Sequence, residues 1–401
     1  MLNYLKGFLL SILALLSPNT ALPLLFLWIG GEHVIVKRLA IFQSFPQDIL
    51  KILACLLGWA VISSFWSLSP YDSAIASIKL LGFVLLGVSW LAVCSQQSSS
   101  VTFLFMKGLA IGCSSVAIFM LTDYASGEPF VHFREVGSIK VYSAASHVLA
   151  LCFYPLCFWI YRKIDPLLCF LFAGTTIAAL YTVDIDIILV SLLLGGLVQG
   201  LAFLLPRKVF KIMWQAGFTL LVGIFPFICA FVLSPVVIQN INQNMPIFSY
   251  IHRLYIWHFL SEKVVHHPLI GYGFDTTRLY KFVHPPLYTW TFFEKTGGGR
   301  IVQNTPHYEP LFYHAHNFII QWWFELGLVG VLLSGLFFLK VFARAHELAH
   351  PQRIMTFGYS TTAIAIALAS VDFWNSWWFA ALWISSGIVA LVNAHPRSTL
   401  D

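Results

Sequence analysis

Apolar stretches of about 20 residues follow one another along the chain, separated by short polar segments. This is the length that an α-helix needs to cross the hydrocarbon core of a bilayer. The first two stretches are shorter, are separated by Ser17-Pro18-Asn19, and also fit one kinked span. The pattern predicts up to twelve helices, over residues 5–17, 20–36, 50–66, 75–95, 102–122, 143–161, 167–183, 185–205, 212–233, 317–341, 355–371 and 375–393.

One long polar interruption, residues 234–316, separates the ninth predicted helix from the tenth. It holds eight of the fourteen histidines and many proline, glycine and aromatic residues. Aromatic side chains are typical of segments that lie along a membrane interface. We therefore divide the chain into helices 1–9 over residues 1–233, a large loop with interfacial helices over 234–316, and helices 10–12 over 317–401.

The composition agrees with a polytopic all-α membrane protein. The chain is 59% hydrophobic and 10% charged, whereas soluble domains carry about 25% charged residues. The net charge of +6 does not indicate a nucleic-acid partner, because in a membrane protein the placement of Lys and Arg matters more than their sum. The seven cysteines lie in apolar stretches without a C-x-x-C pair, so we expect small buried side chains. The first stretch lacks a clear A-x-A cleavage site, so we expect it to be retained.

The basic residues predict the orientation. Cytoplasmic loops of membrane proteins carry an excess of Lys and Arg. Counting the predicted spans places one set of basic residues on a single side, which we assign to the cytoplasm, and the large loop then faces the exterior or the periplasm. Because that face has no ATP, any transfer reaction there needs a substrate already activated on a lipid. The basic set is Lys37-Arg38, Arg162-Lys163, Arg207-Lys208-Lys211, Lys340–Arg353 and Arg397.

Polar residues gather where the large loop meets the tenth predicted helix. His316 and Asn317 stand at this junction, and Asn317, Gln321 and Glu325 follow at intervals of four, so they share one helix face. Ionisable groups in a membrane helix are costly and usually face a bundle interior or a wet cavity. A neutral imidazole at the outer face suits a general base near neutral pH. The alternative is structural, with His316 capping the helix start.

Glycines mark two places where the backbone needs space. Gly327 and Gly330 lack side chains, so a neighbouring helix is expected to approach closely there. In the large loop, His267-Pro268 ends a predicted helix and Gly271 and Gly273 permit a tight turn.

Arg253 is the strongest cationic candidate in the large loop. It shares one side of the predicted helix that begins at His252 with Trp257 and Leu260. Its planar guanidinium group offers five donors and suits phosphate oxygens. The alternative is an interfacial helix whose arginine touches lipid headgroups.

Several other residues are weaker candidates for substrate binding. Each lies in or near the predicted outer face, where charged residues also serve as simple interfacial anchors. They are Lys79, Arg134, Asp184, Asp186, Arg278, His314 and Asp372. Lys281 and Arg300 add further positive charge to the large loop.

The sequence does not predict a metal site or a nucleotide phosphate loop. His314-x-His316 is a possible chelating pair, but H-E-x-x-H and a Cys-His cluster at ligand spacing are both absent. The segment "KTGGGR" at 295–300 lacks the G-x-x-x-x-G-K-[ST] spacing. We therefore expect no metal and no cofactor.

Two motifs together resemble a known family. His316-Asn317, followed after nine residues by Gly327-x-x-Gly330, resembles the H-N-x9-G-x-x-G motif of bacterial O-antigen ligases. Arg253-x3-Trp257, followed by His267-Pro268-Leu-x-Gly271-x-Gly273, resembles the start of the large periplasmic loop of that family. The segment "SSFWSLSP" at 63–70, the acidic Asp372 and the predicted topology are also similar.

One segment departs from the family pattern. Family members often carry an Arg in a T-x-S-R-like segment at the outer end of a middle span. The corresponding stretch here is 181–186, "YTVDID", which has no Arg. Arg134 on the neighbouring outer loop is the nearest substitute by predicted topology.

The resemblance implies a metal-independent, inverting glycosyltransferase of GT-C-like fold in the bacterial inner membrane, with its site facing the periplasm. The donor would be a glycan on undecaprenyl pyrophosphate, and the acceptor a sugar hydroxyl of lipid A-core. His316 would be the base, and Arg253 would stabilise the leaving pyrophosphate. The residues implied in substrate binding are Asn317, Arg134, Lys79, His314, Arg278 and Asp372.

The motifs leave other functions open. An O-antigen or polysaccharide polymerase and a protein O-oligosaccharyltransferase use the same type of site. A membrane transporter is a different class, but the spans show no obvious inverted repeat with paired broken helices, and the polar residues crowd the outer face. A purely structural membrane protein would not need Arg253 and His316 at the family spacing.

Overall fold

A computed structural model describes most of the chain. The described residues are 2–16, 23–24, 26, 45–134, 138–183, 185–244, 248–279, 290–296, 299–305 and 314–394. Some predictions fall outside these ranges. They concern Ser17-Pro18-Asn19, most of the helix predicted over 20–36, Lys37-Arg38, Asp184, Lys281 and Arg397.

Among the described residues, the regular secondary structure is helical apart from one β-hairpin in the large loop. In the hairpin, β1 (Trp290–Thr296) pairs antiparallel with β2 (Gly299–Thr305), with Trp290 opposite Thr305 and Thr296 opposite Gly299. The helices are α1 (Leu2–Leu16), α4 (Gln47–Ser63) with a 3-10 turn η1 (Ser64–Trp66), α5 (Pro70–Cys94), α6 (Ser99–Ala125), α7 (Pro129–Phe133), α8 (Ser138–Lys163), α9 (Pro166–Tyr181), α10 (Asp186–Leu204), α11 (Arg207–Val232), α12 (Pro235–Asn244), α13 (Phe248–His266), α14 (Thr276–Leu279), α15 (Phe318–Glu347), α16 (His350–Ala369) and α17 (Ser376–Ala394).

The structure confirms a polytopic helical membrane protein. Among the described residues, eight helices are long and apolar enough to cross a membrane, and α1 and α9 are shorter apolar helices. The number of twelve spans therefore stays a prediction. Within residues 234–316 the structure describes three helices, α12, α13 and α14, and a hairpin that the alternation of hydrophobic and polar residues did not predict. The interfacial location of these helices stays a prediction.

Local sequence sets the starts of several helices. Asp165 accepts hydrogen bonds from the backbone N–H groups of Leu167 and Leu168, and Pro166 occupies the first turn of α9. Ser98 caps α6 in the same way through Val101 N–H. These side chains satisfy donors that have no partner inside the helix.

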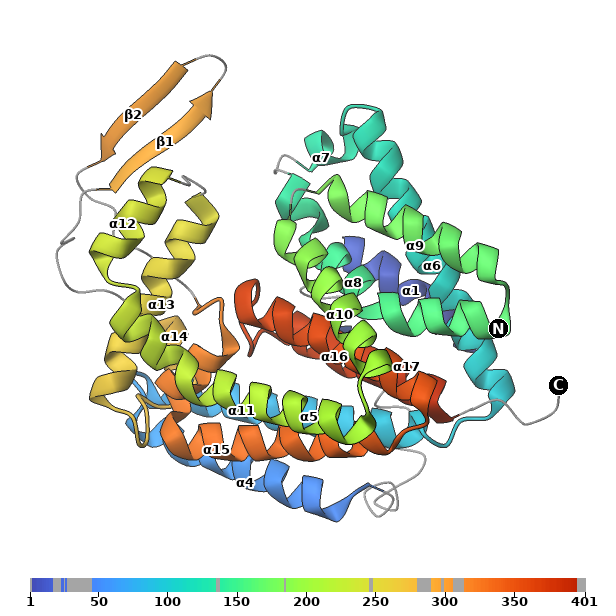
Figure 1. Ribbon diagram of the computed structural model, residues 1–401, viewed down its shortest axis with the longest axis horizontal. Coiled ribbons are helices and arrows are strands. Elements are labelled where there is room, and N and C mark those ends of the chain that lie inside the picture. The colour runs from blue at the N-terminus through green and yellow to red at the C-terminus, as the bar shows by residue number, and fades with distance from the viewer. Residues whose placement is uncertain are drawn as a thin grey trace.

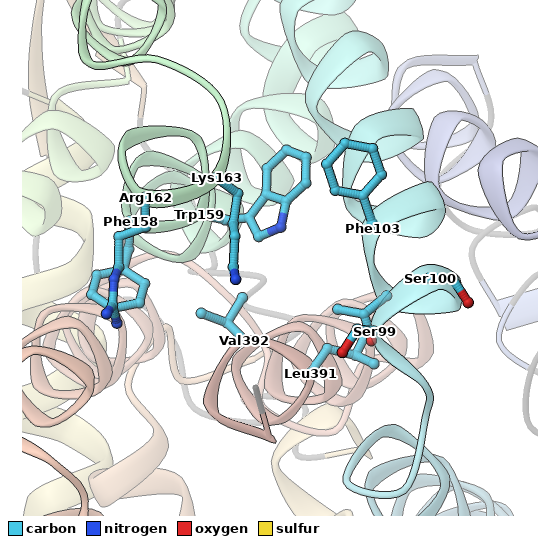
Figure 2. Close-up of a pocket in the computed structure, with 10 residues that line it drawn as sticks. Ser99, Ser100, Phe103, Phe158, Trp159, Arg162, Lys163, Leu391 and Val392 are labelled. Carbon is cyan, nitrogen blue, oxygen red and sulfur yellow. The ribbon is translucent and has the colours of Figure 1, made fainter. Parts of the chain in front are cut away.

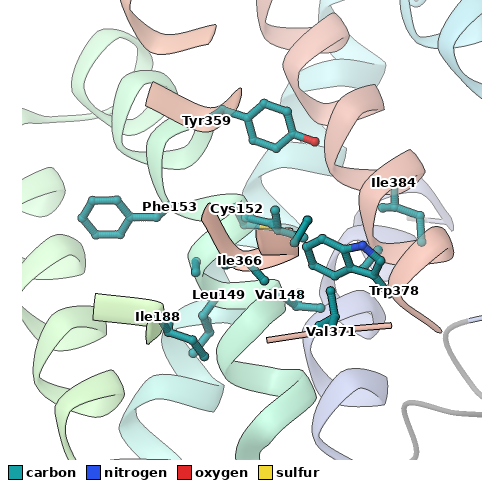
Figure 3. Packing of buried hydrophobic residues seen from close by; sticks show 14 of the residues in the cluster. Val148, Leu149, Cys152, Phe153, Ile188, Tyr359, Ile366, Val371, Trp378 and Ile384 are labelled. Atoms are coloured by element: carbon teal, nitrogen blue, oxygen red, sulfur yellow. The ribbon is translucent and has the colours of Figure 1, made fainter. Parts of the chain in front are cut away.

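The helices form two groups with α16 and α17 between them (Figure 1). One group contains α4, α5, α11 and α15, and the other contains α1, α6, α8, α9 and α10. Small residues bring α1 and α6 together, since a Cβ on Gly108 would lie 2.0 Å from the Tyr4 carbonyl oxygen. Figure 3 shows the apolar packing between α8, α10, α16 and α17, where Leu149, Ile366 and Trp378 are buried.

The helix that follows the large loop is broken at Gly327. This residue has a φ of 61°, which is outside the helical range. The break leaves the carbonyl oxygens of Phe324 and Glu325 and the N–H groups of Leu328 and Val329 without helical partners, and inside a membrane such groups must be satisfied by other protein groups.

The loop segment 268–273 supplies those partners. Tyr272 N–H donates to Phe324 O at 2.8 Å, and Leu328 N–H donates to Pro268 O at 2.8 Å. Two further bonds, Gly273 N–H to Glu325 O at 3.0 Å and Val329 N–H to Leu269 O at 3.4 Å, complete the exchange. The large loop is thus hydrogen-bonded to α15 at the break around Gly327.

The expected role of the glycines is therefore corrected in part. Gly327 makes room for the loop and not for a neighbouring helix, since a Cβ there would lie 2.5 Å from Leu269 O. A Cβ on Gly271 would meet the Glu325 carbonyl group at 2.7 Å. At Gly330 the nearest atoms belong to Leu326 of the same helix.

Candidate active site

His316 lies at the entrance of α15 in a left-handed backbone conformation, with a φ of 51°. Its Nδ1 is 3.4 Å from the Ser370 carbonyl oxygen at the end of α16. Its ring packs against that of His314, with 3.8 Å between centroids. An imidazole that donates through Nδ1 keeps Nε2 as an acceptor.

Asn317, and not His316, caps α15. Its Oδ1 accepts from Ile319 N–H at 3.0 Å and from Ile320 N–H at 3.1 Å, and its Nδ2 donates to Leu368 O at 2.9 Å. Both ends of the amide are therefore engaged within the protein, and the side chain fixes the junction of α15 with α16.

A histidine that the sequence motifs did not single out supports this junction. His147 on α8 is 1% exposed, and its Nε2 is 2.9 Å from the Ser370 hydroxyl oxygen. Ser370 thus contacts His147 through its side chain and His316 through its carbonyl oxygen. The only sequence signal was an ionisable residue inside an apolar stretch, because its partner is distant in the chain.

Arg253 on α13 is held beside the same junction. Its guanidinium carbon lies 5.9 Å from the ring centroid of Tyr250, a cation–π contact. Trp257, one turn further on, donates from Nε1 to Ala315 O at 3.1 Å and so ties α13 to the segment that carries both histidines. The spacing Arg253-x3-Trp257 therefore has a structural basis.

The electrostatic environment keeps the histidines of this cluster neutral. Burial, followed by the charges of His314 and Arg253, lowers the pKa of His316 to about 2. Burial also lowers the pKa of His314 and of His252, and Arg253 lowers both further. Since these groups influence one another, they share one site in which a cation stands beside uncharged imidazoles.

A second polar cluster lies deeper along α15 and centres on Glu325, which is 0% exposed. Its carboxylate accepts from Trp374 Nε1 at 2.6 Å, from Thr277 N–H at 3.2 Å and from Gln321 Nε2 at 3.4 Å. The prediction that Gln321 and Glu325 share one face is confirmed. Glu325 joins the loop at α14 to the connection between α16 and α17.

Asp372 links the two clusters. Its Oδ1 accepts from Gln321 Nε2 at 3.0 Å and from Trp374 N–H at 3.2 Å. Its negative charge also raises the pKa of His314, against the effect of burial. The carboxylate therefore acts on both the glutamate cluster and the histidines.

The segment "SSFWSLSP" at 63–70 contacts the large loop at Thr276. The Ser67 hydroxyl is 2.9 Å from that of Thr276. Next to it, Asp275 accepts from Arg278 at 2.5 Å, and burial raises the pKa of Asp275 to about 6. Lys79 is exposed on α5, and its charge acts on Asp275 in the opposite direction to burial.

Arg134 is not brought into these clusters by any contact among the described residues. It is exposed at the end of α7, which Figure 1 places with the α6, α8 and α9 group and away from α13. The stretch without the family's Arg meets α13 instead, where Tyr250 donates to Asp186 at 3.1 Å. Arg300 lies in β2.

The arrangement suits a reaction with an anionic leaving group. A half-buried guanidinium group stands beside neutral imidazoles at the start of a broken helix, and the charge of Asp372 acts on one of these imidazoles, His314. Among the residues that the structure describes, no group of three or more His, Cys, Asp or Glu side chains is arranged to hold a metal ion.

Comparisons with known proteins agree with this picture. A family model described as O-antigen ligase matches residues 142–334. This range includes both polar clusters apart from Asp372, Trp374 and Ser370. A Rickettsia felis protein named "Putative polysaccharide ligase" is 28% identical over 220 residues, which is 54% of this chain and 49% of that protein. Proteins of the same description from Rickettsia prowazekii and Rickettsia bellii are each 24% identical over 84% and 86% of this chain, and over 78% and 80% of their own length. The chain thus spans about half the length of the first of these relatives.

Proposed function

Because this chain is a member of an O-antigen ligase-like family, we propose that it transfers a glycan from undecaprenyl pyrophosphate to a sugar hydroxyl of lipid A-core. The reaction takes place in the bacterial inner membrane at the periplasmic face. The observation that carries the proposal is the placement of Arg253 beside neutral His314 and His316 at the entrance of α15.

In the proposed reaction, the acceptor hydroxyl oxygen attacks the anomeric carbon of the donor glycan from the face opposite the pyrophosphate. The bond from this carbon to the pyrophosphate oxygen breaks, and the electron pair stays on that oxygen. Arg253 stabilises the developing charge, and His316 takes the hydroxyl proton on Nε2. The configuration at the anomeric carbon is inverted, and the step needs no metal.

The low pKa of His316 fits this role once the donor is bound. Without substrate, burial and Arg253 disfavour the imidazolium form. A bound pyrophosphate adds negative charge beside the ring and offsets Arg253, so it raises the pKa of His316 and favours proton uptake at the moment of transfer. The free site therefore holds a neutral acceptor that becomes a stronger base only with the donor present.

The remaining candidates are assigned to substrate binding. His314 and Asp372 orient the acceptor next to His316, with Asp372 acting as a hydrogen-bond acceptor. Arg278 and Lys79 attract the phosphates of the lipid substrates at the membrane face, and Arg134 adds positive charge to the outer face from the end of α7, outside the two clusters. Asn317 contributes by holding the start of α15.

We extend the proposal to the whole architecture. The chain has about twelve spans in a GT-C-like arrangement, in which residues 1–233 and 317–401 form the membrane part and 234–316 the periplasmic loop. The break in α15 supports this division, because it fixes the loop to the membrane part through four backbone hydrogen bonds.

An acceptor-dependence assay tests the function. Purified protein receives a glycan on undecaprenyl pyrophosphate, either alone or together with rough lipopolysaccharide. We expect glycan on lipid A-core only when rough lipopolysaccharide is present. Lengthening of the donor without acceptor would replace the proposal with a polymerase, and transfer to added protein but not to lipopolysaccharide would replace it with a protein O-oligosaccharyltransferase.

A further inference from the structure

A cavity with cationic side chains in its wall lies at the opposite end of the helices from His316. It is a cavity of about 330 Å³ between the start of α6, the end of α8 and the end of α17. Arg162 comes fifteen residues after His147 on α8, so the pocket is about 22 Å from the histidine junction along that helix. The proposed transfer reaction does not use this pocket.

The pocket is lined by cations without opposing acids. Arg162 and Lys163 at the end of α8 contribute the charges, and none of the ten described residues around the cavity is acidic. Figure 2 shows the Lys163 amine between Trp159 and Val392, with Ser99 and Leu391 on another side of the cavity. The wall formed by Ser99 and Ser100 is the first turn of α6, whose backbone N–H groups and dipole favour an anion.

A buried hydroxyl group without a partner points to a ligand in this pocket. Thr102 lines the cavity and is 5% exposed, yet its Oγ1 has no hydrogen-bond partner among the described residues. A buried hydroxyl left in this state is costly. A phosphate oxygen in the cavity would accept from it.

The other walls are apolar. Trp159 and Phe103 pack with 5.6 Å between ring centroids, and Leu391 closes the α17 side. Free inorganic phosphate gains nothing from such walls, whereas the glycerol backbone and upper acyl chains of a lipid do. Aromatic rings at this level are also typical of a membrane interface.

We propose that this pocket binds the phosphate group of an anionic phospholipid from the cytoplasmic leaflet. Arg162 and Lys163 hold the phosphate, the first turn of α6 and the Thr102 hydroxyl donate to it, and Phe103 and Trp159 contact the chains. The basic residues Arg162 and Lys163 are predicted to lie on the cytoplasmic face. Anionic lipids of the cytoplasmic leaflet attract basic residues there.

The test is native mass spectrometry of the full chain in detergent with added phosphatidylglycerol. The variants are Arg162→Gln with Lys163→Gln, which removes both charges, and Thr102→Val, which keeps the shape but removes the hydroxyl. The matched control is Lys208→Gln with Lys211→Gln, two exposed cations on the same face outside the pocket. We expect retention of the lipid to fall about tenfold or more in the first variant and several-fold in the second, with no change in the control.

Equal lipid retention by the wild type and the Arg162/Lys163 variant would overturn the proposal. A competition arm separates a lipid from free phosphate. We expect excess inorganic phosphate to leave the bound phosphatidylglycerol in place, and complete displacement would overturn the lipid assignment. Because the buried Thr102 hydroxyl has no internal partner to lose, Thr102→Val should melt at or above the wild-type temperature without lipid, which shows that its loss of binding is not misfolding.

Discussion

At the residue scale, a small number of neighbouring groups decides the protonation state of His316 in the candidate site. Burial together with Arg253 keeps His316 neutral, and Ser370 fixes its ring through Nδ1. The motif predicted the position of His316 but not these neighbours, because Ser370 and His147 reach it from helices far away in the sequence. Sequence spacing identifies residues on one helix face, whereas contacts between helices depend on the fold.

The first prediction concerns His147. Replacing it with Phe removes the hydrogen bond to Ser370 and should lower the transfer rate about fivefold, since one buried hydrogen bond contributes about 1 kcal/mol. His147→Gln keeps a polar nitrogen near the position of Nε2 and should recover most of the rate. The measurement is the initial rate of glycan transfer. Equal rates for the Phe and Gln variants would contradict a positioning role for His147.

The second prediction concerns the pH dependence of stability. The pKa of His316 is lowered from its ordinary value of 6.5 to about 2, so the unfolded chain binds a proton below pH 6.5 that the folded protein does not. This contribution to stability is fully present above pH 6.5 and is lost progressively as the pH falls below it. It amounts to at most about 2 kcal/mol between pH 7 and pH 5.

Melting temperatures at both pH values check this prediction. His316→Gln cannot titrate, so it should lose less stability on acidification than the wild type. Asp275, whose pKa is raised to about 6, opposes the effect because its contribution grows as the pH falls. An identical acid sensitivity of the His316→Gln variant and the wild type would show that His316 is not held neutral by the fold.

At the element scale, the central feature is the broken helix α15. Hydropathy predicted a single helix over 317–341, and the structure confirms a helical element there. The sequence did not reveal the break, because a G-x-x-G spacing equally fits close packing of two helices. The break depends on the segment 268–273, which supplies the missing hydrogen bonds from more than fifty residues away in the chain.

The third prediction tests this element. Gly327→Ala forces a side chain into a left-handed backbone position and against Leu269 O, so it should destabilise the protein by at least about 2 kcal/mol. The matched control is Gly335→Ala in the same helix, where an added Cβ meets nothing within 4 Å and helix propensity favours Ala. Thermal melting compares the two. Equal melting temperatures for both variants would exclude the proposed fastening of the loop to α15.

At the scale of the whole molecule, polar chemistry gathers at two opposite ends of the helices. The candidate active site joins α8, α13, α15 and the α16–α17 connection, and the proposed phospholipid pocket joins α6, α8 and α17. Composition was sufficient to predict a membrane protein, and the orientation derived from the basic residues stays a prediction. Neither composition nor the basic residues predicted how the large loop docks, because that depends on contacts between distant segments.

The fourth prediction concerns orientation. Cysteines are introduced one at a time as Arg134→Cys and Lys208→Cys, both at exposed positions. The parent chain has the exposed Cys55 and the partly buried Cys157 and Cys169 changed to Ser, and its labelling is the background. A membrane-impermeant maleimide added to cells with a permeabilised outer membrane should label Arg134→Cys. It should label Lys208→Cys only after the inner membrane is opened. The reverse pattern would place the candidate active site in the cytoplasm.

The most direct measurement of the central claim is the rate of glycan transfer to lipid A-core by His316→Ala beside His266→Ala. His266 is an exposed histidine of the same loop and serves as the matched control. We expect the His316 variant to lose transfer by at least about a hundredfold, the range of general-base catalysis, while the His266 variant keeps the wild-type rate. A correctly folded His316→Ala protein that transfers glycan at the wild-type rate would contradict the assignment of this site.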